Sequence, residues 1–153
     1  MSVNIVSSQE SYPQIKGYFS VVHPIVSVDK DQSHFNFSDT YTVGFPTGIN
    51  ILKSDHIGFS FEITPFIKVE NGVDKMSNVL YHPGVLFRYK KGFTFITRLA
   101  FETSGRYGFT PVFNKVFLKK NGISYFLATP FPVRFGNEKP ISISPSFQIG
   151  ISF

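Results

Sequence analysis

The feature that most constrains the fold is an alternation of side-chain type at the C-terminal end of the chain. From residue 141 to residue 153, every odd position carries Ile, Pro or Phe, and every even position carries Ser, Gln or Gly. Side chains of a β-strand point alternately to its two faces, so the run predicts one strand with an apolar face and a polar face. The run exceeds a typical strand of about 5–6 residues. It is long enough for a tilted membrane crossing of about 9–11 residues.

The same alternation recurs upstream, which extends the prediction to an all-β chain of about eight strands. Two of these segments, 17–28 and 109–118, are apolar on both faces, so their inward face stays open. No segment has the 3.6-residue period of a helix. The predicted strands cover residues 17–28, 41–52, 56–70, 79–89, 93–103, 109–118, 125–136 and 141–153.

The connections between these segments alternate in length. Short turns are expected at 53–55, 90–92 and 119–122, and longer loops at 29–40, 70–78, 103–108 and 136–140. Membrane barrels carry short turns at one end and longer loops at the other. The pattern therefore predicts a closed antiparallel up-and-down barrel over residues 15–153, preceded by an N-terminal segment, residues 1–14.

Composition excludes several classes of protein. The chain has no Cys, so it has no disulfide framework and no thiol nucleophile. Its net charge of +5 resides partly in short turns, and no nucleic-acid motif accompanies it. No apolar run approaches the ~20 residues of a membrane-spanning helix. Residues 1–6 lack the basic start and long apolar centre of a signal peptide, so an exported protein would be in a mature or re-engineered form.

Alternation alone does not say which face of the barrel is apolar, but three observations favour a lipid-facing apolar surface. The polar faces combine small residues with charges of both signs, which suits a crowded interior better than a water-facing surface. The apolar faces are almost free of charge. Aromatic residues stand near strand ends, where a membrane barrel places its aromatic girdle; they are Tyr41, Tyr89, Tyr125 and Phe153. Proline residues inside the strands oppose this interpretation, since each removes a ladder donor.

The last strand resembles the C-terminal signature of bacterial outer-membrane proteins. Phe153 is the final residue, and Ile151, Ile149 and Phe147 precede it at every second position. The overall plan is similar to the small eight-stranded barrels of the OmpA and OmpX type. The resemblance implies insertion into the bacterial outer membrane and recognition of the last strand by the barrel-assembly machinery.

A set of charged residues is expected in the lumen. One interpretation is a narrow ion path or gate, and the other is an internal salt-bridge network that holds the barrel shut. An eight-stranded barrel leaves an interior only wide enough for its own side chains, which favours the network. The set comprises Glu62, Lys68, Arg88, Arg98, Glu102 and Arg134.

Metal and cofactor sites are not expected. The four histidines, His23, His34, His56 and His82, have no metal-ligand spacing, and we interpret them as isolated structural residues. No catalytic residue and no cofactor is assigned.

Two alternatives stay open. A soluble lipocalin-like barrel would turn the apolar faces inward around an apolar ligand, although the chain has no Trp for the lipocalin signature. An outer-membrane lipid acyltransferase would need a loop His, Ser and Asp. The candidates in the first two loops are Asp31, Ser33, His34, Ser38, Asp39, Asp74 and Ser77.

The sequence therefore predicts a non-enzymatic outer-membrane barrel with a structural, adhesion or accessory-subunit role. Its expected partners are outer-membrane lipid, the assembly machinery and a larger outer-membrane complex, with no nucleic acid. Arg106, Tyr107 and the 70–78 segment are the expected surface for recognition.

Overall fold

The computed structural model describes residues 11–38 and 40–153, and these residues form an all-β structure. The first half of the chain contains Gln14–Pro24 (β1), Val26–Val28 (β2), Ser33–Phe35 (β3), Thr40–Gly44 (β4), Thr47–Leu52 (β5), Ile57–Glu70 (β6) and Val73–Arg88 (β7). After the 3₁₀ turn Lys90–Gly92 (η1) follow Phe93–Glu102 (β8), Tyr107–Lys120 (β9), Ile123–Pro130 (β10), Val133–Phe135 (β11), Ser142–Ile143 (β12) and Ser146–Ser152 (β13). No helix in the described ranges is long and apolar enough to cross a membrane.

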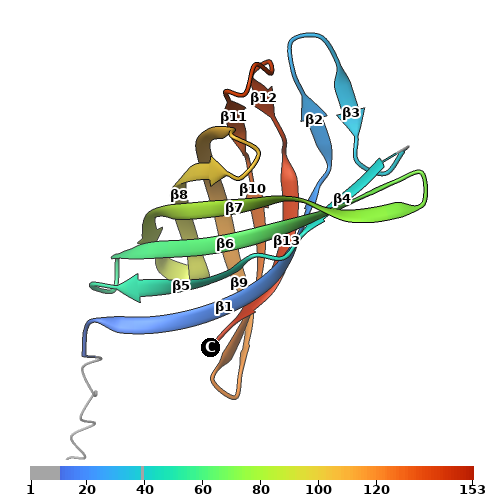
Figure 1. Ribbon diagram of the computed structural model, residues 1–153. Coiled ribbons are helices and arrows are strands. Elements are labelled where there is room, and N and C mark those ends of the chain that lie inside the picture. The colour runs from blue at the N-terminus through green and yellow to red at the C-terminus, as the bar shows by residue number, and fades with distance from the viewer. Residues whose placement is uncertain (1–10, 39) are drawn as a thin grey trace, which may run out of the picture.

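The strands close into an antiparallel barrel of eight strands, which confirms the predicted fold class. Neighbours in sequence pair with one another from β4 and β5 through to β10 (Figure 1). The barrel is closed by β13, which pairs with β10 on one side and with β1 on the other. Backbone hydrogen bonds of 3.0 Å in both directions between Gly17 and Phe153 extend the closing seam to the end of the last strand.

Several of the eight barrel strands are interrupted at prolines, which accounts for some of the prolines that the sequence places inside strands, whereas Pro65 and Pro83 lie within the continuous strands β6 and β7. Pro46 separates β4 from β5, Pro132 precedes β11, and Pro145 lies between β12 and β13. Their carbonyl groups still accept hydrogen bonds of 2.9–3.0 Å from Ser20, Ser144 and Ile25 of neighbouring strands. The missing N–H groups therefore fall at breaks in the ladder, where a proline costs least.

The two ends of the barrel differ as predicted. The short turns and Phe153 lie at one end, here called the turn end, and the longer connections lie at the other, here called the loop end (Figure 1). The prediction of a long loop at 70–78 is wrong. Asn71 and Gly72, at φ 52° and 75°, form a two-residue hairpin turn, and β7 begins at Val73. An Asn-Gly pair is the strongest short-range hairpin signal, and β6 and β7 extend beyond their barrel neighbours because of it.

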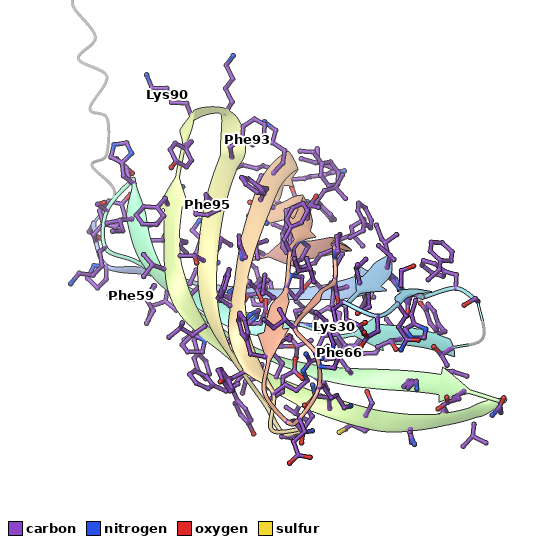
Figure 2. All side chains as sticks on the ribbon, turned by 90° about the horizontal axis from the view of Figure 1, so that it is seen from above. Lys30, Phe59, Phe66, Lys90, Phe93 and Phe95 are labelled. Atoms are coloured by element: carbon purple, nitrogen blue, oxygen red, sulfur yellow. The ribbon has the colours of Figure 1, made fainter. Side chains whose placement is uncertain are left out.

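The barrel is polar inside and apolar outside. Along β6, Phe59 is 57% exposed, while Ser60 and Glu62 on the opposite face are 2% and 3% exposed. Figure 2 shows side chains such as Phe59 and Phe93 directed away from the barrel. More of the buried residues are polar or charged than apolar. This distribution reverses that of a water-soluble barrel, whose apolar face is internal.

The two strands with undecided faces also alternate between inward and outward side chains, but their inward side mixes polar with apolar residues. In β1 the buried side chains are Tyr18, Ser20 and Val22, and in β9 they are Thr110 and Val112. The outward side of both strands is aromatic, as at Phe19, Phe109 and Phe113. The lipocalin-like alternative needed the alternating apolar residues to line a cavity, and the structure places them outside.

Candidate functional site

The charged residues of the lumen meet in its central part because strand parity turns them inward. Glu62 lies on β6 between buried Ser60 and Thr64, and Arg98 lies on β8 beside the fully buried Ala100. Both charged side chains are about as inaccessible as the small ones, with Arg98 and Glu62 each 3% exposed. A buried charge requires an opposite charge and hydrogen-bond partners, so their surroundings decide whether the site is stable.

Glu62 is the most heavily bonded residue in the lumen. Its Oε2 lies 3.3 Å from Nη1 of Arg98 and accepts a 2.9 Å hydrogen bond from the Tyr18 hydroxyl. Its Oε1 accepts from Thr64 at 3.2 Å and contacts Nδ1 of His82 at 3.0 Å. Because a carboxylate only accepts, Nδ1 of His82 carries the proton.

Arg98 is satisfied from the opposite side. Its Nε and Nη2 donate to the Ser60 hydroxyl at 3.2 and 2.9 Å, and Nη2 also donates to the Tyr18 hydroxyl at 3.0 Å. Strands β1, β6 and β8 are therefore joined through the interior by one ion pair and its hydroxyl partners. Such hydrogen bonds to a charged group are the strong class of protein hydrogen bond.

A second ion pair continues the chain of contacts. Nε2 of His82 lies 2.9 Å from the Thr110 hydroxyl, which accepts a 3.0 Å hydrogen bond from Nη1 of Arg134. Arg134 then pairs with Glu102, Nε to Oε1 at 2.6 Å. A neutral His82 accepts the Thr110 proton at Nε2, so Thr110 and both ring nitrogens of His82 have hydrogen-bond partners. With two carboxylates and two guanidinium groups, the network carries no net charge.

Glycine makes room for the two largest side chains of this network. A Cβ at Gly84 would lie 2.6 Å from Cγ of Arg98 and 2.2 Å from the carbonyl oxygen of Thr97. At Gly48 a Cβ would lie 2.5 Å from the Tyr18 hydroxyl oxygen. These positions therefore explain why the inward faces of β5 and β7 carry glycine beside the charged residues.

The structure places four of the six predicted lumen residues in this network and separates the other two from it. Lys68 lies near the loop end of β6, where its partly exposed side chain pairs with Glu70 at 3.1 Å. Arg88 lies at the turn end, and its Nη1 is buried without a hydrogen-bond partner. The prediction of a single charged cluster is therefore wrong for Lys68 and Arg88, because they lie toward opposite ends of the barrel, away from the central network.

Sequence reasoning missed Tyr18, His82, Ser60 and Thr110 as members of the network. Tyr18 and Thr110 belong to the strands with two apolar faces, where parity is undecided without a neighbour in register. His82 is structural, as expected, but it is not isolated, since it bridges Glu62 and Thr110. Its cross-strand partner Glu62 is the signal that could have identified it.

The network divides the lumen into two spaces. A cavity of about 230 Å³ lies on the loop side and includes Glu102, Arg106 and Arg134 in its lining. A cavity of about 110 Å³ lies on the turn side and includes Tyr18 and Arg88. Arg98, Val112 and Gln148 line both cavities, so they form the partition between them.

The expected recognition surface at the loop end is only partly available. Tyr107 is exposed, whereas Nη2 of Arg106 donates to the carbonyl oxygens of Arg134 and Pro140 at 3.1 and 2.7 Å. Arg106 thus ties the β8–β9 connection to the segment that precedes β12. Its role in the structure is to hold two loop-end segments together.

The C-terminal strand turns its alternating apolar residues outward. Phe147, Ile149 and Phe153 point outward and are exposed, and Ile151 on the same face is partly exposed. The Phe153 ring covers Gly17, where a Cβ would lie 2.7 Å from its Cε2 atom. Whether the assembly machinery reads this strand stays a prediction.

The acyltransferase candidates are not joined into a hydrogen-bonded set in the described residues. The Ser38 and Ser77 hydroxyls donate to the carbonyl oxygens of Phe35 and Phe66 at 2.9 and 3.2 Å. His34 is exposed on β3, and Asp39 lies outside the described residues.

In the first loop, the carboxylate that accepts hydrogen bonds from the backbone is that of Asp29. The N–H groups of Asp31 and Gln32 donate to it and hold its pKa below the ordinary value. In the described ranges, no group of three or more His, Cys, Asp or Glu side chains is placed to hold a metal ion.

No protein-family model and no curated protein matches the sequence. Two solved structures share the fold. One comes from the de novo design of transmembrane β-barrels, with a TM-score of 0.58 and 13% identity over 95% of this chain and 98% of that one. The other is the solution NMR structure of the de novo designed TMB2.3, with a TM-score of 0.53 and 12% identity over 95% and 97%. The likeness shows the barrel fold. It does not extend to the OmpA and OmpX type, which stays a prediction.

Proposed function

We propose that this protein is an integral outer-membrane β-barrel with a sealed lumen and a non-enzymatic role. In this role the barrel anchors its loop-end hairpins in the membrane, for adhesion or as an accessory subunit of a larger envelope complex. The observation that carries the proposal is the charge-neutral network that crosses the interior from Tyr18 to Glu102 while the outer face is apolar. A membrane pore needs a hydrated path, and this lumen is partitioned by buried, mutually bonded side chains.

The surface supports membrane insertion independently of the lumen. Soluble monomers rarely expose contiguous apolar patches larger than a few hundred Å². Here large apolar side chains are exposed around the whole barrel, for example Phe61 on β6, Leu99 on β8 and Ile149 on β13. Near the turn end, Lys115 lies 4.0 Å above the ring of Phe93 and bonds the Lys91 carbonyl oxygen. A lysine stem on aromatic surface with its charge at the rim fits a membrane–water interface.

The loop end offers the surface for a partner. The β6–β7 hairpin projects past the barrel, and the β2–β3 hairpin projects beside it (Figure 1). An aromatic cluster lies at the base of the β2–β3 hairpin. Its members are His23, Phe35, Phe37 and Tyr41, and the centroids of contacting rings are 5.4–6.5 Å apart. Hairpins that project beyond a closed barrel suit recognition more than transport.

Ion conductance across planar bilayers tests the sealed lumen. We expect no stepwise current from the wild-type barrel. The double variant Glu62→Ser with Arg98→Ser removes the central ion pair and keeps small polar groups, so it should admit water and raise the current. A matched double variant at the partly exposed pair, Lys68→Ser with Glu70→Ser, should give no current, like the wild type. Stepwise wild-type currents would contradict the proposal.

A further inference from the structure

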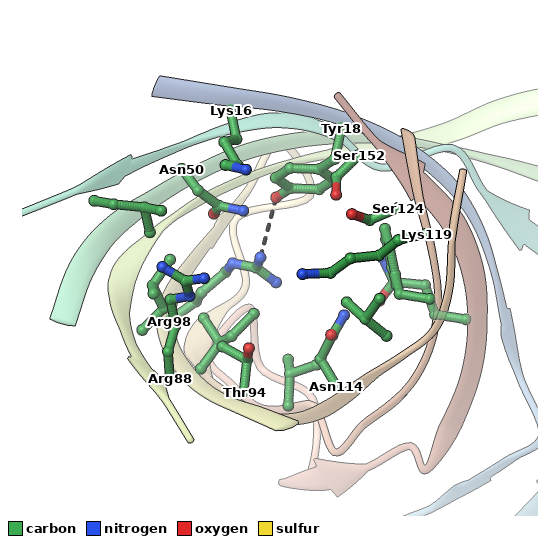
Figure 3. Close-up of a pocket in the computed structure, with 17 residues that line it drawn as sticks. Lys16, Tyr18, Asn50, Arg88, Thr94, Arg98, Asn114, Lys119, Ser124 and Ser152 are labelled. Atoms are coloured by element: carbon green, nitrogen blue, oxygen red, sulfur yellow. Dashed lines mark hydrogen bonds between the residues drawn. The ribbon is translucent and has the colours of Figure 1, made fainter. Parts of the chain in front are cut away.

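The cavity at the turn end is lined by cations and by no carboxylate. Lys16 on β1, Arg88 on β7, Arg98 on β8 and Lys119 on β9 contribute to its wall. Figure 3 shows Lys16, Arg98 and Lys119 directed toward a common space from different strands. Glu62 neutralises Arg98 from the far side of the partition. Within the described residues, no ion pair joins the other three cations to a carboxylate.

Two buried polar atoms in the same wall have no hydrogen-bond partner. They are Nη1 of Arg88, a donor, and Oδ1 of Asn50, an acceptor. Buried polar atoms are satisfied in the great majority of proteins, by protein groups or by a bound species. A single species that satisfies both must accept from a guanidinium group and donate to an amide oxygen. Water and hydrogenphosphate both meet this requirement, and the cations of the wall favour the negatively charged species.

The neutral part of the wall combines hydrogen-bonding groups with apolar side chains, the latter from Leu52, Leu86, Ile96, Val112, Val116 and Phe126. Amide groups come from Asn50 and Asn114, and hydroxyl groups come from Thr94, Ser124 and Ser152. The space is about 110 Å³. Since about 10–15 Å³ of such space admits one water, the cavity has room for several waters or one small polyatomic anion.

The charge distribution of the whole barrel favours anions at this end. Besides the cavity residues, the turn end carries Lys53, Lys90, Lys91, Lys115 and Lys120, and Asp55 is the acidic residue that the described chain places there. The loop-end cavity contains Glu62 and Glu102 beside its arginines. A one-sign field at a cavity mouth raises the local concentration of the opposite ion.

We propose that the turn-end cavity binds a small soluble oxyanion of the phosphate class, with Lys16, Arg88 and Lys119 as its charged ligands. Arg88 supplies the planar donor fork that matches phosphate oxygens, and the lysines supply point charge. A soluble anion is favoured over a lipid headgroup because the cavity lies inside the barrel, whereas lipid contacts the outer face. The partition at Arg98 makes the cavity a closed-ended site.

Inorganic phosphate is the probe for a calorimetric titration of the full chain, refolded in a sugar-based detergent and phosphate-free buffer. We expect saturable binding that weakens with added salt. Arg88→Gln and Lys119→Gln should each weaken it roughly tenfold or more, since each removes a charge-assisted contact. Lys120→Gln is the matched control, because that exposed turn lysine is outside the cavity wall, and it should bind as the wild type does.

Several results would overturn the proposal. Wild-type protein that shows no saturable binding has no such site. An equal loss in Lys120→Gln would reduce the effect to general surface charge. Tighter binding of phosphatidic-acid vesicles than of inorganic phosphate in the same titration would assign the cations to a lipid headgroup. Boiled and unboiled gel mobility establishes that each variant is folded, and Lys119→Gln changes only an exposed strand end.

Discussion

Replacement of Glu62 by Ala should destabilise the barrel more than any other single change to its charged residues. The carboxylate pairs with Arg98 at 3.3 Å and accepts hydrogen bonds from Tyr18 and His82 at 2.9 and 3.0 Å. Its removal leaves the Arg98 guanidinium buried without an opposite charge. Breaking one partner of a buried ion pair typically costs about 3–5 kcal/mol. We expect a loss in that range in the free energy of unfolding.

Urea unfolding in lipid vesicles measures this loss. The chain has no Trp, so far-UV circular dichroism and the heat-dependent shift in gel mobility replace the usual fluorescence signal. Glu62→Gln keeps one acceptor oxygen and the side-chain volume, and it should lose less stability than Glu62→Ala. Glu70→Ala is the control: its pair with Lys68 is partly exposed, and such pairs contribute about 0–1 kcal/mol.

The double variant Glu62→Leu with Arg98→Met separates the loss of the pair from the cost of an orphaned charge. Replacing both members of a buried pair by apolar side chains of similar volume is often neutral or stabilising. We therefore expect the double variant to recover most of the stability lost in Glu62→Ala. A Glu62→Ala barrel as stable as the wild type would refute the reasoning, because Arg98 would then have a partner other than Glu62.

Three further predictions follow from local geometry. Gly84→Val should cost about 1–3 kcal/mol of overpacking in the same urea assay, since its Cβ meets Arg98 and the Thr97 carbonyl oxygen; unchanged stability would contradict the close approach. Phe153→Ala should slow assembly into the outer membrane of exporting cells more than refolding in detergent, and equal losses would count against an assembly signal. Exchanging Asn71-Gly72 for Ala-Ala should destabilise the β6–β7 hairpin tip, because both residues need positive φ; hydrogen exchange at Val73 and Glu70 measures this, and unchanged protection would contradict it.

The barrel could be predicted from the sequence because its two faces differ in every strand that alternates cleanly. The period of two assigned the inward residues of 56–70, 93–103 and 141–153 without any knowledge of neighbours. It failed at β1 and β9, where Tyr18 and Val112 are apolar or aromatic and yet point inward. Because the lumen also holds large apolar side chains, both faces of these strands are apolar, and the alternation does not show which face points inward.

The candidate site was predictable in kind but not in detail. Charges on the polar faces had to be paired, and Glu62 with Arg98 is such a pair. Which partners meet depends on register, and register depends on bulges that the alternation does not show. One lies opposite Phe66 and Ile67, where Ser77 is the extra residue of β7, and it shifts the register of β7 against the loop-end part of β6. Arg88 was placed correctly on the inward face, but its distance along the lumen from the network is a property of the closed barrel.

Lipid exposure along β6 tests the central claim most directly. The chain contains no Cys, so single cysteines at residues 57–64 can each carry a spin label in vesicle-inserted protein. Burial alternates at every one of these positions, with Ile57, Phe59, Phe61 and Ile63 outward. We predict that labels at the odd positions collide with lipid-dissolved oxygen and that labels at the even positions do not. Odd positions that contact a water-soluble relaxing agent in place of oxygen would contradict an apolar surface embedded in the membrane.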